Sequence, residues 1–286
     1  MKRFLSLSFL ALAACGQGEN GPSTDTETTS AANVKLYALD CGRVDMNDLS
    51  IFTQGNEYDG RTNKAASTCY LIRHPDGDLI WDAGFPDALN DAEGGITNGP
   101  FHVSLPIKIS TQLDQLGLSA DDIEYLSLSH THFDHVGGAG QFAGSTFIVH
   151  ESEREFMFRD DARADEQGFA AYAALENAET IEFTGDYDVF GDGSVTILSM
   201  PGHTPGHTSL TVNLANEGPV MLVGDLYHLN ESREHRYVPK FNTDVEDTLA
   251  SMDRFEGIAK ENGARVVIQH SMKDFEALPK FPAYLD

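Results

Sequence analysis

Short hydrophobic runs recur along the chain from residue 33 onward, and they predict strands. The runs are rich in β-branched and aromatic residues and are bounded by Gly, Pro and Asp, which is typical of strands. The predicted strands span residues 34–39, 68–73, 79–81, 123–129, 146–149, 195–199, 209–214, 220–223 and 265–269. No linker-like stretch interrupts this region, so we expect residues 34–286 to form a single domain.

Helical patterns lie between some of the predicted strands. They span residues 106–116, 151–158, 168–175 and 245–261. In the last, apolar residues recur every three or four positions, and Asn262-Gly263 supplies a stop signal. Strands that first follow one another and then alternate with helices predict an α/β fold whose sheets are covered by helices. Residues 46–64 form a long loop of the kind that often carries function.

The start of the chain has the pattern of an export signal. Lys2 and Arg3 precede an apolar run over residues 4–14, about half the roughly 20 residues that a membrane-spanning helix needs. Residues 1–15 therefore predict a secretory signal peptide.

The end of this signal, LAAC, resembles a bacterial lipobox, in which Cys15 becomes the lipidated N-terminus. Gly16 follows this cysteine. In Gram-negative lipoproteins, a residue other than Asp at this position implies sorting to the outer membrane. Residues 16–33 hold no large apolar residue and predict a flexible tether. We expect an exported lipoprotein whose domain faces the periplasm and whose only membrane contact is its lipid anchor.

Composition and charge narrow the class of partner. A hydrophobic content of 41% excludes disorder throughout the chain. The net charge of −26 argues against nucleic-acid binding, because phosphate backbones are held by clustered Lys and Arg. Cys41 and Cys69 form either a disulfide or two buried free thiols, and the sequence leaves both open.

Four potential metal ligands lie within six residues where the strand over 123–129 ends. The segment reads His130-Thr131-His132-Phe133-Asp134-His135. Side chains of extended backbone alternate, so the first two histidines point to one side. Asp134 and His135, which follow the turn, can face a second ion. Imidazole with carboxylate suits zinc or a similar divalent ion.

Further ligand candidates also lie at strand ends, where a rigid scaffold can direct them to one point. His207 lies in the turn-rich segment 201–208, between two predicted strands. Asp225 and His270 each follow an apolar run. We expect His203, in the same turn-rich segment, to brace a loop by hydrogen bonding.

These positions together resemble the HxHxDH signature and later ligands of the metallo-β-lactamase superfamily. The resemblance covers residues 34–286 and implies an αββα sandwich with two metal ions, expected to be zinc, at one edge of the sheets. It implies that one ion is held by His130, His132 and His207, the other by Asp134, His135 and His270, and that Asp225 bridges them.

Several stretches are similar to the N-acyl-homoserine lactone lactonases, the quorum-quenching branch of this superfamily. They are LYALDCG, CYLIRHPDGDLIWDAG, HTHFDHVGG, DVFGDGSV, PGHTPGHTSL and GDLYH. The implied reaction is opening of the lactone ring by a hydroxide that bridges the two ions. Asp134 is then expected to pass a proton to the leaving alkoxide.

The chain departs from this branch at one position. The branch commonly places a Tyr three residues after the bridging Asp, where this chain has His228, preceded by Tyr227. Neighbours on a strand point oppositely, so only one of the two is expected in the site. We favour His228 as the donor to the substrate carbonyl. The candidates for an apolar groove that holds the acyl chain are Met46, Ile51, Phe52, Phe101 and Phe133.

Other functions stay open at this point. An organophosphate triesterase or an arylesterase would use the same ligands. A β-lactamase is disfavoured by Asp225, and a glyoxalase II-like thioesterase by the few residues after His270. A lipoprotein that binds metal or a signal molecule without turnover is disfavoured by the complete ligand set. The expected partner is a small acylated lactone, and the chain is either a monomer or a homodimer.

Overall fold

The computed structural model describes residues 33–286. The predicted signal peptide with Cys15, and the tether up to residue 32, lie outside the described residues. The strands are β1 (Lys35–Met46), β2 (Asn63–His74), β3 (Gly77–Trp81), β4 (Ile96–Asn98), β5 (Phe101–Ser104), β6 (Tyr125–Ser127), β7 (Thr146–His150), β8 (Thr180–Phe183), β9 (Tyr187–Asp188), β10 (Val195–Ser199), β11 (Thr208–Leu214), β12 (Gly218–Leu222) and β13 (Arg265–Val267).

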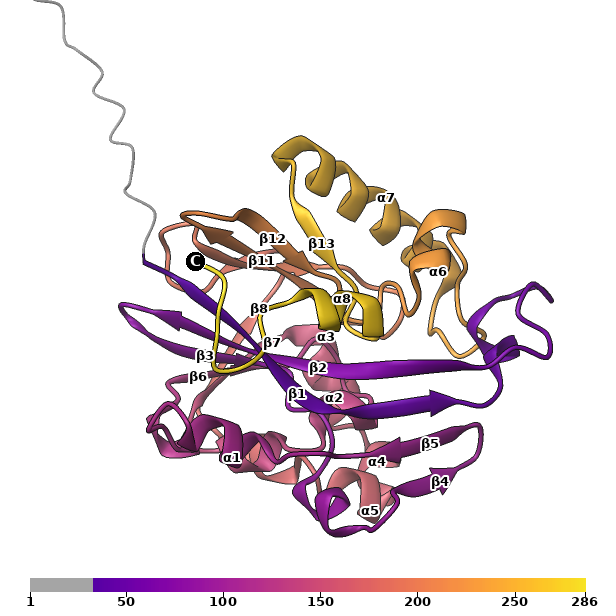
Figure 1. The fold of residues 1–286 in the computed structure, drawn as a ribbon, viewed down its shortest axis with the longest axis horizontal. Coiled ribbons are helices and arrows are strands. Elements are labelled where there is room, and N and C mark those ends of the chain that lie inside the picture. Colours follow the sequence, from indigo (N-terminus) through magenta and orange to yellow (C-terminus); the bar gives the residue numbers. More distant parts are fainter. Residues whose placement is uncertain (1–32) are drawn as a thin grey trace, which may run out of the picture. The chain divides into compact units, whose positions relative to one another are not determined.

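Helices connect or cover these strands (Figure 1). The α-helices are α1 (Ile109–Asp114), α2 (Phe133–Val136), α3 (Glu151–Met157), α4 (Asp160–Ala164), α5 (Glu166–Phe169), α6 (Asn230–His235), α7 (Val245–Asn262) and α8 (Met272–Ala277). The 3-10 helices are η1 (Leu49–Phe52), η2 (Asp87–Asp91), η3 (Ala120–Asp122), η4 (Ala139–Phe142) and η5 (Ala173–Asn177).

The strands form two sheets. The larger sheet has the order β4-β5-β1-β2-β3-β6-β7-β8, and the smaller has the order β13-β12-β11-β10-β9. Each predicted strand overlaps an observed one. The strands β1 and β2 are longer than predicted because they keep pairing beyond an irregularity between Asp40 and Arg43. This extension shortens the predicted loop over 46–64, which also contains η1.

Three of the four predicted helices are confirmed as α1, α3 and α7. The helix α7 ends at Gly263, whose φ of 60° suits the left-handed C-cap that glycine favours. The prediction of one helix over 168–175 was wrong, since the chain forms α5 and then η5. The carboxylate of Asp165 caps α5 at Gly168 N, and the Tyr172 hydroxyl donates to the Met157 carbonyl, so the segment turns early.

Alternating side chains build a four-layer αββα sandwich, which confirms the expected fold. In β12, Val220 and Leu222 face the core between the two sheets. Their neighbours Met221 and Val223 face outward and pack with residues of α7, including Phe255. Figure 1 shows α7 on the outer side of the smaller sheet and α1 on the opposite side of the molecule's two sheets. The central strands of both sheets are therefore buried on both faces, whereas the edge strand β4 is exposed.

Cys41 and Cys69 form a disulfide, which decides between the two states that the sequence left open. Both residues are fully buried, and they join β1 to β2 with their Cα atoms 5.7 Å apart. Within residues 33–286, no helix combines the length and the apolar character needed to cross a bilayer.

Parallel pairing places the ends of several strands at one edge of the sandwich. In the larger sheet β3 runs parallel to β6, and in the smaller sheet β12 runs parallel to β13. The two sheets are joined at this edge by hydrogen bonds from Thr208 N to Ser129 O (2.9 Å) and from Thr68 Oγ1 to Gln269 O (3.1 Å). The segments that follow these strands therefore meet, and they carry the predicted ligands.

Candidate metal centre

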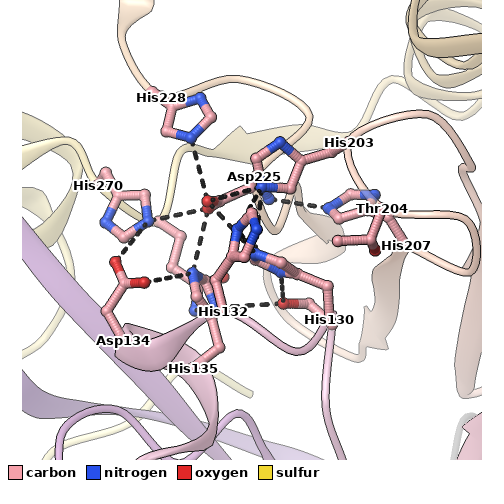
Figure 2. A network of polar contacts seen from close by, with 12 residues as sticks. His130, His132, Asp134, His135, His203, Thr204, His207, Asp225, His228 and His270 are labelled. Atoms are coloured by element: carbon pink, nitrogen blue, oxygen red, sulfur yellow. Dashed lines mark hydrogen bonds and ion pairs between the residues drawn. The ribbon is translucent and has the colours of Figure 1, made fainter. Parts of the chain in front are cut away.

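Histidine and aspartate side chains form two adjacent groups at this edge (Figure 2). The first group consists of His130, His132, His203 and Asp225, and the second consists of Asp134, His135 and His270. In each group the potential ligand atoms all lie within 4.8 Å of one another. In the first, His132 Nδ1 lies 2.9 Å from the Nε2 atoms of both His130 and His203.

Asp225 lies between the two groups. Its Oδ2 is 3.5 Å from His130 Nε2 and 3.4 Å from His203 Nε2. Its Oδ1 is 3.2 Å from His135 Nε2 and 2.8 Å from His270 Nε2. One carboxylate thus presents one oxygen to each group, which is the arrangement that a ligand shared by two ions requires.

The donor set fits divalent cations. Tetrahedral zinc, with Zn–N bonds of about 2.05 Å, separates its ligand nitrogens by about 3.3 Å. The facing nitrogens of His130 and His203 are 3.2 Å apart. Among the described residues, His135 Nε2 and Asp225 Oδ1 are buried without a hydrogen bond, although both point into the cluster. Buried polar atoms are normally satisfied, so these two are suited to bind a cation.

The protonation states of the histidines differ between the groups. Burial lowers the pKa of His130 and of His132 well below its ordinary value, which keeps their lone pairs free for a metal. Burial opposes the charged form of His270 too, but Asp225 and Asp134 outweigh it and raise the pKa to about 9. A bound cation would replace this proton beside the carboxylates, so metal binding is expected to release protons.

Asp82 lies outside the two ligand groups and joins three segments of the site by hydrogen bonds. Its buried carboxylate accepts hydrogen bonds from Ser129 N (2.6 Å), His135 Nδ1 (2.9 Å) and Gln269 Nε2 (2.7 Å). The bond fixes Nδ1–H on His135 and leaves Nε2 facing the cluster. Asp82 holds a φ of 63°, which is rare for a residue with a side chain and is found where the surroundings enforce it. The sequence offered one signal, an Asp directly after a strand.

Six of the seven predicted metal ligands lie in the two groups, and His207 does not. Its Nδ1 lies 2.9 Å from the Met200 carbonyl, and its Nε2 accepts a hydrogen bond from Asp225 N at 2.9 Å (Figure 2). Both ring nitrogens are therefore occupied by the backbone, and burial lowers the pKa of His207 to about 3. His207 positions the backbone of Asp225, and the expected roles of His203 and His207 are exchanged.

The sequence contained a signal for this assignment. His203 follows the end of β10, as His130, Asp225 and His270 follow the ends of their own strands. His207 instead directly precedes the start of β11. The rule that ligands follow strand ends therefore selects His203.

Glu153 of α3 joins the two loops that carry the first group. Its Oε1 accepts from Thr131 N (2.8 Å), and its Oε2 accepts from Thr204 Oγ1 (2.6 Å) and Gly206 N (3.0 Å). A Cβ at Gly206 would lie 2.2 Å from Glu153 N, so this close contact requires glycine. Burial raises the pKa of Glu153 to about 7, although the three hydrogen bonds lower it.

His228 and Tyr227 point to opposite sides of the chain, although they lie in an irregular segment after β12 and not on a strand as expected. His228 Nε2 is 3.0 Å from Asp225 Oδ2, so this imidazole faces the cluster. Tyr227 packs edge-on against Phe255 in the core beneath α7. The structure therefore places His228 in the site and leaves Tyr227 outside it, which corrects the inclusion of Tyr227 among the catalytic candidates.

An apolar groove of about 290 Å³ leads to the cluster. Its apolar wall consists of Val44, Met46, Ile51, Phe52, Phe101, Phe133 and Phe241. All five predicted groove residues are among them. Phe241 was not among the predicted groove residues. Its ring centroid lies 5.3 Å from that of Phe52 and 6.3 Å from that of His132. We call the four phenylalanines of this wall the aromatic collar.

A two-sheet sandwich with two adjacent groups of imidazole and carboxylate ligands at one edge defines a metal-dependent hydrolase. Residues 63–270 match the metallo-beta-lactamase superfamily, and the chain belongs to this superfamily.

Curated relatives and solved structures narrow the class of hydrolase that the chain is similar to. The N-acyl homoserine lactonase AttM of Azorhizobium caulinodans is 30% identical over 89% of this chain and 99% of its own. The lactonase AiiA of Bacillus thuringiensis subsp. kurstaki is 28% identical over 88% and 98%. The crystal structure of an N-acyl homoserine lactone hydrolase with N-hexanoyl-L-homoserine bound at its catalytic metal centre is similar, with a TM-score of 0.75, 28% identity and coverage of 88% and 98%.

The exchange of roles between two histidines can be tested by metal content. In protein reloaded with Zn²⁺, His203→Ala should lose one of the two ions. His207→Ala should keep both but bind them about 10- to 100-fold more weakly, because it removes only a support for Asp225. Elemental analysis and chelator competition measure both effects. Loss of an ion from His207→Ala with two retained by His203→Ala would contradict the assignment.

The raised pKa of Glu153 predicts that the unfolding free energy of the protein depends on pH. Its pKa in the folded protein, about 7, lies above the ordinary 4.5, so between these values the folded state retains a proton that the unfolded chain has lost. Its contribution to the unfolding free energy therefore falls as pH rises through this range, by roughly 3 kcal/mol. Urea unfolding of metal-free protein should show that Glu153→Gln removes this slope.

The exposed Glu155→Gln on the same helix is the matched control, and it should leave the slope unchanged. Parallel pH profiles of the wild type and Glu153→Gln would contradict the role of Glu153.

Proposed function

We propose that the chain hydrolyses the lactone ring of N-acyl-homoserine lactones with two divalent ions, an activity that removes quorum-sensing signals. The observation that carries this proposal is the position of the two ligand groups at the base of the apolar groove. The polar lactone ring of such a substrate would lie beside the ligand groups, and its acyl chain would lie along the aromatic collar.

Two divalent ions supply a water of lowered pKa and polarise the carbonyl when bound. The residues of the chain orient the substrate around them. His228 is buried, and burial lowers its pKa, which favours the neutral imidazole with one N–H. Its Nε2 faces Asp225 Oδ2 at 3.0 Å, so this N–H can donate to the lactone carbonyl once the ions bind the carboxylate. Its ring is held by Phe52 at 4.9 Å and by parallel stacking on His270 at 5.8 Å.

Asp134 is the proposed proton carrier. Its carboxylate lines the groove, with Oδ2 3.6 Å from His270 Nε2 and Oδ1 3.9 Å from His135 Nε2. A carboxylate at the open side of the second group can take a proton from the attacking water. It can then deliver that proton to the alkoxide that leaves when the ring opens.

The aromatic collar is the proposed binding surface for the acyl chain. Phe101 lies 6.2 Å from Phe52 and 6.0 Å from Phe133 between ring centroids, so the rings form a continuous apolar wall. Phe133 and Phe241 are 51% and 40% exposed, which leaves apolar surface available at the entrance. Burying this surface against methylenes is favourable by about 25 cal/mol per Å².

Zinc is the proposed metal. The first group offers three imidazoles and a carboxylate, and the second offers two imidazoles with carboxylates. Nitrogen-rich sets of this kind suit zinc better than magnesium or calcium, which prefer oxygen ligands.

We also propose that residues 1–15 are a lipoprotein signal peptide, that Cys15 carries the lipid, and that residues 16–33 tether domain 34–286 to the outer membrane on its periplasmic side. The residue pattern at the start of the chain supports this proposal. The Cys41–Cys69 disulfide also supports export, because disulfides persist in oxidising compartments.

The activity is tested with the full chain reloaded with Zn²⁺. Acid release from N-hexanoyl-homoserine lactone should exceed hydrolysis of paraoxon, an aryl ester, nitrocefin and a glutathione thioester by about 100-fold in kcat/KM. Asp134→Asn is the inactive control. No lactone turnover by protein that holds both ions would refute the proposed function, and faster turnover of another substrate would identify the correct one.

The lipid anchor is tested by fractionation of cells that express the full chain. The wild type should sediment with outer membranes and require detergent for release. Cys15→Ser should leave the precursor unprocessed or the protein in the soluble fraction, because the acylated residue is lost. Cys41→Ser serves as a control that removes a different cysteine. Unchanged membrane fractionation of Cys15→Ser would refute the anchor.

A further inference from the structure

One side chain outside the ligand groups contacts the outer ring nitrogen of His203. Asn242 lies in the loop between α6 and α7, and its Oδ1 is 2.8 Å from His203 Nδ1. Its Nδ2 donates to Thr248 Oγ1 in α7 at 3.0 Å. Thr248 is fully buried, so the asparagine connects a potential metal ligand to the core.

The directions of these hydrogen bonds follow from the hydroxyl of Thr248, the last group in this series of contacts. Thr248 Oγ1 donates its only proton to the Asp244 carbonyl at 2.5 Å. It can then only accept from Asn242, so the NH₂ of the asparagine faces Thr248. The amide oxygen therefore faces His203, and Nδ1 of that histidine must donate.

This order fixes the tautomer of His203. With its proton on Nδ1, the ring keeps a lone pair on Nε2, which lies 2.9 Å from His132 Nδ1 and 3.4 Å from Asp225 Oδ2. The lone pair thus points into the first group. In the reverse tautomer, a proton would occupy the place of the cation.

The backbone around this contact is held independently of Asn242. The His203 carbonyl accepts from Thr243 N at 3.1 Å, and the Gly202 carbonyl accepts from Asp244 N at 2.9 Å. A Cβ at Gly202 would lie 2.3 Å from Thr248 N, so the turn packs directly on the start of α7. The loop can therefore keep its path when only the Asn242 side chain is changed.

We propose that Asn242, oriented by Thr248, is a positioning residue that sets the tautomer of His203 for cation binding. The inference rests on the proposed two-metal site. It assigns to the loop between α6 and α7 a role that none of the sequence motifs indicated. Partners of this kind commonly change metal affinity 10- to 100-fold when they are removed.

Metal titration of the full chain tests the proposal without any substrate. Metal-free protein is titrated with Co²⁺ against a competing chelator, and the visible spectrum reports each ion. Asn242→Ala should weaken one of the two ions by about 10- to 100-fold and alter only its bands. Asn242→Asp should restore the affinity, because a carboxylate accepts the same hydrogen bond from Nδ1. The exposed Asn216→Ala in the β11–β12 turn is the matched control.

A second pair of variants tests the orientation of the amide. Thr248→Val keeps the shape of the side chain but removes the acceptor for Asn242 Nδ2, so it should weaken the same ion. Thr248→Ser should bind like the wild type. Thermal unfolding confirms that each variant is folded.

Three outcomes would overturn the proposal. They are wild-type affinity in Asn242→Ala, failure of Asn242→Asp to exceed Asn242→Ala, and equal loss of both ions in Asn242→Ala. A wild-type chain that binds two ions but opens no lactone would refute the proposed function and leave this inference standing. A wild-type chain that binds no Co²⁺ would refute both.

Discussion

The buried carboxylate of Asp225 is the group on which the rest of the site depends. It is 3% exposed and lies within 3.5 Å of imidazole nitrogens from both ligand groups. A charge taken out of water is costly unless it is paired and hydrogen bonded. The sandwich meets this cost by placing imidazoles around the carboxylate oxygens and by holding the backbone N–H of Asp225 with His207.

The imidazoles in turn need partners on their outer sides. His135 is held by Asp82, His270 by the Ala66 carbonyl at 2.8 Å, and His203 by Asn242. Each bond directs one lone pair inward. Asp82 directly follows β3 and Ala66 lies in β2, both in the larger sheet, and Asn242 lies in the loop before α7. Asp225 and His270 follow strands of the smaller sheet, so the site is assembled only when both sheets and the loop are in place. This is why a two-sheet scaffold, rigid on both sides, suits two ions at its edge.

Much of the fold could be read from the sequence because its signals are local. Alternating apolar residues in β12 and the three-to-four spacing in α7 each determine an element without reference to the rest of the chain. The short strands β4, β5, β8 and β9 were missed. They hold few apolar residues and exist because a neighbouring strand supplies their hydrogen bonds. The helix expected over 168–175 failed because Asp165 and Tyr172 bind nearby backbone groups instead.

The sequence by itself determined the kinds of ligand and their positions near strand ends. These follow from residue chemistry and from the local residue patterns that mark strands. The position after a strand end favours His203, but only the tertiary structure decided between His203 and His207, because the ring nitrogens of each are engaged by residues of other segments. The choice is made by distant groups: Asn242 frees one ring nitrogen of His203 for the cluster, whereas Met200 and Asp225 occupy both nitrogens of His207.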